Sequence, residues 1–271
     1  MLLIDHFLGS ARVRRAIWQL WYPFLTRRLR GDEVLFLNYA FDADGAHALP
    51  LEPADEPNRA CIQLYHHVAT PIDLRGKHML EVSCGHGGGA AWLTRTLQPA
   101  SDTGLDLNPR GVAFCRQRHR VDGLTVVRGD AKNLPFAAAT FDAVINVEAS
   151  HCYPSLPRFL GEVARVLRPG DVLLSAASAW RKRGRWRVMS AIERAELRSM
   201  RRRISRLISR VARSVSGAAA SWASQAARLS RKRKGRDFAG VEGSRIYTAP
   251  QQGAVSYRSY HFEKPAGVGA I

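Results

Sequence analysis

Three acidic residues and a glycine-rich loop are the features of this sequence that could do chemistry. Glu81, Asp106 and Asp130 each lie in, or just after, a short apolar run. The first run leads into "SCGHGGGAAW", where Gly85 and Gly87 let the backbone turn sharply and approach a ligand closely. If the runs are neighbouring parallel strands, the three carboxylates ring one crevice and can accept hydrogen bonds from a polar cofactor.

Two cofactors fit the glycine loop taken alone. Gly85-x-Gly87-x-x-Ala90 matches a dinucleotide fingerprint, and Asp106 lies roughly 20 residues on, as a ribose-binding acid should. Glu81 distinguishes the dinucleotide from S-adenosylmethionine. A carboxylate at this position can approach the methionine end of S-adenosylmethionine, often through a bound water, whereas it offers nothing to an anionic pyrophosphate. Asp130 can hydrogen-bond an adenine amino group. A single such acid is usually a solvated turn residue, but the three together favour S-adenosylmethionine.

These residues belong to a regular alternation of apolar runs and helical patterns that begins at residue 78. Strands are expected at residues 78–83, 102–107, 124–129, 141–148 and 171–176, and helices at 87–97, 109–119 and 156–167. Such βα units predict an α/β fold with a doubly wound, mostly parallel sheet, in which ligands bind at the carboxyl ends of the strands.

The expected organisation has four parts. They are an N-terminal helical cap or membrane-facing segment at residues 1–70, the S-adenosylmethionine-binding α/β core at 71–180, a basic lid segment at 181–236, and closing strands with a tail at 237–271.

The motifs "LEVSCGHGGG", "GLDLN", "GDAKNLPF", "FDAVINVEASHCY" and "VARVLRPG" follow one another as in class I S-adenosylmethionine-dependent methyltransferases, which the chain resembles over about residues 78–170. Ser83 stands where that family commonly has glycine. More narrowly, "DEPNRACIQLYHHVAT", "INVEASHCYP", "DFAGVEGSRIYT" and "VSYRSYHFEKP" resemble the mycobacterial phthiotriol/phenolphthiotriol dimycocerosates methyltransferases. The resemblance implies O-methylation of a hydroxyl on a long envelope lipid. Two alternatives stay open: methylation of RNA or a small metabolite, and an inactive, membrane-associated protein that still binds the cofactor.

A secondary alcohol is a poor nucleophile, so methyl transfer to it calls for a base near the end of the fourth strand. The segment "VEASHCY" supplies Glu148, His151 and Tyr153 there. We expect His151 to be the base, since its ordinary pKa near 6.5 suits proton removal at neutral pH. Glu148 would orient His151 or contact the cofactor. The alternative is that His151 only packs or caps the next helix, and His66 and His67 are weaker candidates.

Large aromatic residues precede a basic cluster in "IWQLWYPFLTRRLRGDEVLFLNYAF". As a cap, this segment would roof the active site and give a lipid chain an apolar channel. As an interfacial anchor, it would insert Trp18, Trp21, Tyr22 and Phe24 into a membrane surface. The third reading is that these aromatics simply pack onto the sheet.

Residues 171–236 carry most of the charge, with 19 of the 41 Lys+Arg and only 3 of the 23 Asp+Glu. The rest of the chain is balanced, so no nucleic-acid partner is favoured. Apolar residues recur at three- and four-residue steps from Met189 to Val215, which predicts a helix with an arginine face, at a membrane surface or on RNA. Composition rich in Arg, Ser and Ala is also typical of a GC-rich gene read out of frame. We hypothesise that two compensating frameshifts replaced the lid segment.

The remaining expectations concern compartment and metals. No run of 18 apolar residues occurs, and "MLLIDHFLGSARVRR" lacks the features of a secretory signal, so we expect a cytoplasmic protein, peripheral on the inner membrane face if the cap is an anchor. The cysteines Cys61, Cys84, Cys115 and Cys152 lack metal-ligand spacing, so free thiols and no metal site are expected. The sequence leaves the oligomeric state open.

Overall fold

The structure is a computed structural model. It describes residues 24, 27, 34–38, 41, 49–182, 185–186, 201–206 and 255–266; for residues 151, 178–182, 185–186, 201–206 and 255–257 it describes the backbone alone. Trp18, Trp21 and Tyr22 of the expected anchor therefore lie outside the described residues, whereas the side chain of Phe24 is exposed. Among the described helices, none is both long and apolar enough to cross a membrane.

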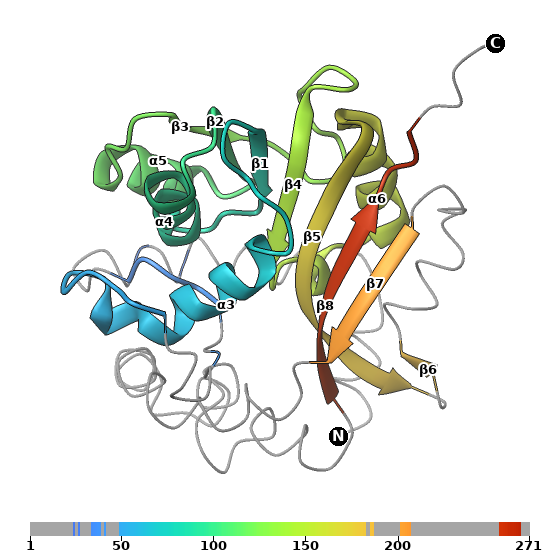
Figure 1. The fold of residues 1–271 in the computed structure, drawn as a ribbon, viewed down its shortest axis with the longest axis horizontal. Coiled ribbons are helices and arrows are strands. Elements are labelled where there is room, and N and C mark those ends of the chain that lie inside the picture. The colour runs from blue at the N-terminus through green and yellow to red at the C-terminus, as the bar shows by residue number, and fades with distance from the viewer. Residues whose placement is uncertain are drawn as a thin grey trace.

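The expected alternation of strands and helices is confirmed (Figure 1). The strands are β1 His78–Val82, β2 Ser101–Asp106, β3 Leu124–Arg128, β4 Phe141–Val147, β5 Leu167–Lys182, β6 Arg185–Trp186, β7 Arg201–Arg206 and β8 Val255–Glu263. The helices are α3 Arg59–Ala69, α4 Gly88–Leu97, α5 Pro109–Arg118 and α6 Leu156–Val166, with the 3-10 turns η2 Glu56–Asn58 and η3 Ser150–Cys152.

The sheet has the order β3-β2-β1-β4-β5-β8-β7, with β6 paired to β5. Strands β1 to β5 pair in parallel, and β8 joins β5 in antiparallel. From β1 the chain builds β2 and β3 on one side, then returns to build β4 and β5 on the other. The strand order therefore reverses between β1 and β4, and a crevice at such a switch point is where doubly wound sheets bind ligands.

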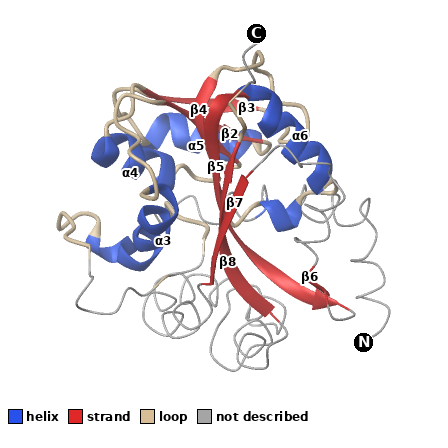
Figure 2. Cartoon of the chain, turned by 45° about the vertical axis from the view of Figure 1, so that its right-hand side comes forward, coloured by secondary structure: helices blue, strands red, loops and turns tan. Residues whose placement is uncertain are grey.

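Helices cover both faces of the sheet, with α3 and α4 on one side and α6 on the other (Figure 2). Side chains of successive strand residues alternate between these faces, so Met79 packs toward α3 and α4 while Leu80 packs toward α6. In α6 the apolar positions Phe159, Leu160, Val163 and Val166 follow the helical period and are buried. Two apolar layers thus hold the strand ends in fixed positions.

The predicted arginine-faced helix between Met189 and Val215 is wrong over Arg201–Arg206. These residues form β7, which pairs antiparallel with β8 from Arg201↔Glu263 to Arg206↔Arg258. An edge strand offers a row of backbone donors and acceptors, and pairing with it depends on the backbone more than on side-chain type. Strand β5 also runs on past Ala176 to Lys182, because β8 continues beside it as far as Trp180↔Val255.

Candidate active site

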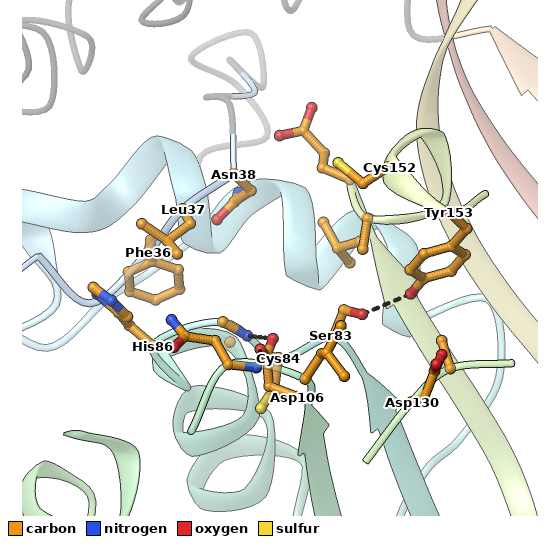
Figure 3. Close-up of a pocket in the computed structure, with 18 of the residues that line it drawn as sticks. Phe36, Leu37, Asn38, Ser83, Cys84, His86, Asp106, Asp130, Cys152 and Tyr153 are labelled. Atoms are coloured by element: carbon orange, nitrogen blue, oxygen red, sulfur yellow. Dashed lines mark hydrogen bonds between the residues drawn. The ribbon is translucent and has the colours of Figure 1, made fainter. Parts of the chain in front are cut away.

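A cavity of about 350 Å³ opens at the carboxyl ends of the parallel strands, on both sides of the switch point (Figure 3). This volume lies in the range of small-molecule sites. Its lining comes from residues 35–38, from Tyr65 and Gly89, and from segments at the ends of four strands. These are 83–86 at β1, 106–109 at β2, 128 with 130–132 at β3, and 147–149 with 152–154 at β4. Gly85, Asp106, Asp130 and Glu148, all predicted from the sequence, are among these lining residues.

The turn after β1 brings the backbone to the edge of the cavity through three left-handed residues: Ser83 at φ 63°, Gly85 at φ 60° and Gly87 at φ 78°. Gly85 lines the cavity, but Gly87 does not. A Cβ at Gly87 would lie 2.9 Å from Cys115 Sγ and 3.0 Å from His119 Cδ2 on the α5 side. The left-handed turn and the close packing against α5 therefore explain why residue 87 is glycine. The sequence had suggested a close approach to the ligand instead.

Asp106 ends β2 and fixes the glycine loop. Its Oδ2 accepts a hydrogen bond from the Gly85 amide at 2.9 Å, and its Oδ1 accepts one from the Asn108 amide at 2.7 Å. Burial raises the pKa of Asp106 to about 6, and these amide bonds oppose the rise. Each carboxylate oxygen keeps a lone pair, so Asp106 can still accept hydrogen bonds from the two hydroxyls of a ribose.

The N-terminus of α4 is occupied by the protein itself. The Gly88 amide donates to the Leu35 carbonyl at 3.0 Å, and a Cβ at Gly88 would lie 2.6 Å from that oxygen. His86 Nδ1 holds the same segment through the Val34 carbonyl at 2.7 Å. A dinucleotide pyrophosphate normally takes such free helix amides, so this arrangement removes one donor it would need. The glycine at 88 serves the close approach of residues 34–38.

Glu81 is buried within β1 and is not among the residues that line the cavity. Its Oε1 accepts a hydrogen bond from Tyr65 Oη at 2.7 Å, while Oε2 is buried without a partner. Burial, and after it the nearby Asp102 carboxyl, raises the pKa of Glu81 to about 8. Tyr65 does line the cavity, and it packs so closely on α4 that a Cβ at Gly89 would lie 2.0 Å from its ring. Glu81 thus reaches the cavity through Tyr65, a partner that the sequence did not indicate.

Asp130 follows β3 and lines the cavity together with Lys132. Its Oδ2 accepts from Lys132 Nζ at 2.7 Å, and its Oδ1 accepts from the Lys132 amide at 3.0 Å. Contact with an adenine amino group would use the lone pairs that remain, so the predicted role is compatible with the geometry and stays a prediction.

The segment after β4 carries the predicted catalytic group. Glu148 lines the cavity, is only 9% exposed, and has a left-handed backbone at φ 55°, while its amide donates to the Ala176 carbonyl at 2.7 Å. The backbone of His151 lies in η3, but its side chain is outside the described part, so its role as base stays a prediction. His66 and His67 do not line the cavity; their rings contact Trp92 and Phe41 instead.

The fold and the cavity together define the class. A doubly wound sheet, a glycine turn after β1, a carboxylate that fixes that turn from the end of β2, and a blocked helix N-terminus fit S-adenosylmethionine better than a dinucleotide. The protein is a class I S-adenosylmethionine-dependent methyltransferase.

Comparisons with known proteins make the assignment narrower. A methyltransferase domain model matches residues 80–175. The phthiotriol/phenolphthiotriol dimycocerosates methyltransferase of Mycobacterium leprae is 48% identical over 265 residues, covering 96% of this chain and 98% of the relative. The fatty-acid O-methyltransferase of Mycolicibacterium smegmatis is 53% identical over 165 residues, 61% of this chain and 60% of that protein. The chain therefore belongs to the family of the phthiotriol/phenolphthiotriol dimycocerosates methyltransferases.

Solved structures agree on the fold. The [4+2]-cyclase SpnF superposes with a TM-score of 0.70 at 20% identity, covering 95% of this chain and 97% of its own. A geranyl diphosphate methyltransferase in complex with geranyl diphosphate and sinefungin gives 0.63 at 17% identity, covering 93% and 98%. One of these proteins is named as a cyclase, so the fold by itself does not specify the reaction.

Proposed function

We propose that this protein transfers the methyl group of S-adenosylmethionine to a hydroxyl oxygen of a long-chain envelope lipid of the phthiotriol or phenolphthiotriol dimycocerosate type. The observation that carries the proposal is the two-sided cavity. Acidic side chains lie at the strand ends, and Phe36 and Leu37 form an apolar wall across from Asp130 and Tyr153 (Figure 3). Such a wall suits an acyl or alkyl chain beside a polar cofactor. The names and the 46–48% identity of the relatives support the same lipid class.

S-adenosylmethionine supplies an activated methyl group on a sulfonium, so the chain has to align the acceptor and remove one proton. The lipid oxygen forms a bond to the methyl carbon as the carbon–sulfur bond breaks, and the hydroxyl proton passes to a base. Glu148 lines the cavity at the end of β4, and His151 follows three residues later, which supports a role for both in this proton transfer. We assign His151 as the base and Glu148 as the residue that orients it or contacts the cofactor.

A fatty-acid carboxylate is the second candidate acceptor. The fatty-acid O-methyltransferase named above supports it. Ether and ester products are chemically distinct, because alkali hydrolyses a methyl ester and leaves a methyl ether intact. The two acceptors can therefore be separated in one assay.

The deciding experiment incubates the full chain with methyl-labelled S-adenosylmethionine and a total mycobacterial lipid extract, followed by mild alkali. Alkali-stable label in the lipid fraction supports the proposal, whereas alkali-labile label shows the fatty-acid reaction. Parallel incubations with RNA and with a small-metabolite extract test the remaining acceptors. Cofactor binding without any transfer would indicate an inactive binding protein. His151→Ala is the matched variant, and we expect it to lower the transfer rate by roughly 10²–10⁴-fold while the cofactor affinity is kept.

The enzyme would meet an insoluble acceptor at the inner face of the membrane, so we propose peripheral contact through the N-terminal segment. The exposed side chains of Phe24 and Arg27 support this placement. Co-flotation with anionic vesicles at low salt, weakened by Phe24→Ser, is the expected result. Absence of the chain from the vesicle fraction would overturn the membrane contact and leave the reaction unaffected.

A further inference from the structure

The backbone of Ser83 has a conformation that is energetically unfavourable for a residue with a Cβ. Its φ of 63° is left-handed, a region that glycine adopts freely and other residues rarely do. Strain of this kind persists where the surrounding structure enforces it, often at a functional site. Ser83 lines the cavity, directly after β1 and before the glycine loop. The retained hydroxyl therefore needs an explanation.

The hydroxyl of Ser83 is the last member of a hydrogen-bonded chain that begins at Asn146. Asn146 Nδ2 donates to the Val82 carbonyl at 2.9 Å, and because a carbonyl can only accept, this bond fixes which end of the amide carries the hydrogens. The second hydrogen of Nδ2 goes to Tyr153 Oη at 2.9 Å. Tyr153 Oη lies 2.7 Å from Ser83 Oγ, the contact drawn as a dashed line in Figure 3.

The direction of the last bond follows from the protons. Tyr153 Oη already accepts from Asn146, and within the described part of the chain Ser83 Oγ is the one oxygen that can take the phenolic hydrogen. If Ser83 donated instead, the phenolic hydrogen of Tyr153, which is part-buried, would have no protein acceptor among the described residues, which is costly. Burial also raises the pKa of Tyr153, so the phenol stays protonated and remains a donor. Ser83 accepts from Tyr153, and its own hydrogen is left for the cavity.

The order of the strands indicates which part of a ligand meets this hydrogen. Asp130 follows β3 and Asp106 ends β2, the positions expected for the adenine and ribose contacts. Because β1 lies next to β2 on the side away from β3, a cofactor laid across these ends brings its methionine end to β1, where Ser83 stands. That end carries a carboxylate, which accepts hydrogen bonds strongly.

We propose that Ser83 donates a hydrogen bond to the methionyl carboxylate of S-adenosylmethionine and that Tyr153 and Asn146 are positioning residues that set the direction of this donation. The inference concerns the cofactor and does not depend on which acceptor is methylated. A failure of methyl transfer to lipid would therefore leave it testable.

The test compares two ligands by calorimetry on the full chain. S-adenosylhomocysteine keeps the methionyl carboxylate, whereas 5′-methylthioadenosine lacks that end. Ser83→Gly deletes the hydroxyl and fits the left-handed backbone, so the fold is expected to keep or gain thermal stability. We expect the Kd for S-adenosylhomocysteine to rise roughly 10- to 100-fold, as for the loss of a hydrogen bond to a charged group, and the Kd for 5′-methylthioadenosine to stay within about twofold.

Ala139→Gly is the matched control, because Ala139 is exposed, has a φ of 52° and lies outside the cavity lining. It relieves the same backbone strain and should leave both affinities unchanged. Tyr153→Phe should weaken S-adenosylhomocysteine binding in the same direction, and the double variant should lose no more than Ser83→Gly alone. An unchanged affinity for S-adenosylhomocysteine in Ser83→Gly, an equal loss for both ligands, or additive losses in the double variant would overturn the proposal.

Discussion

Strands β1 and β7 belong to one sheet and are specified in different ways. In β1, Met79, Leu80 and Val82 are fully buried, and the strand lies between β2 and β4 with helices on both faces. In β7, four of the six residues are arginine, and among the strands that the structure describes it pairs only with β8. The side-chain pattern therefore specifies β1, whereas backbone pairing to an available edge accounts for β7.

Cofactor binding and acceptor binding, the two parts of the proposed activity, differ in the same way as β1 and β7. The described residues that line the cavity lie between Leu35 and Pro154, and none belongs to the basic window of residues 171–236. We propose that cofactor binding resides in the part of the core that lines the cavity. We further propose that residues 181–236 are the altered lid, read in a shifted frame, as a composition rich in Arg, Ser and Ala suggests.

The largest effect is expected from a single methyl group in the core. Gly89→Ala would place Cβ 2.0 Å from the ring of Tyr65, which is buried and held by Glu81. The ring cannot move without breaking that hydrogen bond, so we expect a loss of about 3 kcal/mol or more in the free energy of unfolding, together with loss of cofactor binding. Thermal unfolding checks the first effect and calorimetry the second.

Gly161→Ala is the control for this change. Gly161 lies in α6, and a Cβ there would meet nothing within 4 Å. Alanine in an exposed helix should raise stability by about 0.5–1 kcal/mol. Equal losses at both glycines would show that the packing around Tyr65 is not the reason.

A pH-dependent effect is expected from Glu81→Gln. The folded-state pKa of Glu81, about 8, lies above its ordinary value of 4.5, so the wild-type protein loses stability as pH rises between those values. Glutamine does not titrate, so the variant should match the wild type near pH 5 and exceed it by on the order of 3 kcal/mol near pH 8. Chemical denaturation at both pH values measures the difference. A stability difference that does not change with pH would contradict the buried, protonated state.

Glu56→Gln is the control for that measurement. Glu56 is exposed, and its hydrogen bond to Arg59 lowers its pKa, the opposite direction. Its replacement should give no gain in stability at pH 8.

The smallest of these effects is expected from restoring the reading frame of the lid segment, which tests the comparison of the two regions most directly. The codons of Gly184–Val188 can be written GGG AGG TGG CGG GTG, which from the third base reads Glu-Val-Ala-Gly. Restoring that frame across the lid segment should lower the KM for the lipid at least about tenfold and leave the Kd for S-adenosylmethionine within twofold. If resequencing confirms the present frame and homologues carry the same arginine-rich residues, the frameshift hypothesis is wrong. The segment would then be interpreted as one that binds a membrane surface.

Local patterns predicted the strands and helices from His78 to Ala176 and placed Asp106 and Glu148 at strand ends that meet in one cavity. Long-range partners were out of reach of such patterns. Tyr65 meets Glu81 across 16 residues, and Tyr153 meets Ser83 across 70. The segment at 34–38 covers the glycine loop through backbone carbonyls, which no side-chain type indicates. Ser83, at a position where the family commonly has glycine, was the one sequence signal for the hydrogen bonds that link Asn146, Tyr153 and Ser83.

The measurement that tests the central claim most directly is a calorimetric titration of the full chain with S-adenosylmethionine, beside the variant Asp106→Asn. We predict saturable one-to-one binding that Asp106→Asn weakens by about tenfold or more, because the amide loses the charge that draws ribose hydroxyl donors. Binding by the wild type that the variant leaves unchanged, or no binding at all, would contradict the assignment of this cavity as the cofactor site.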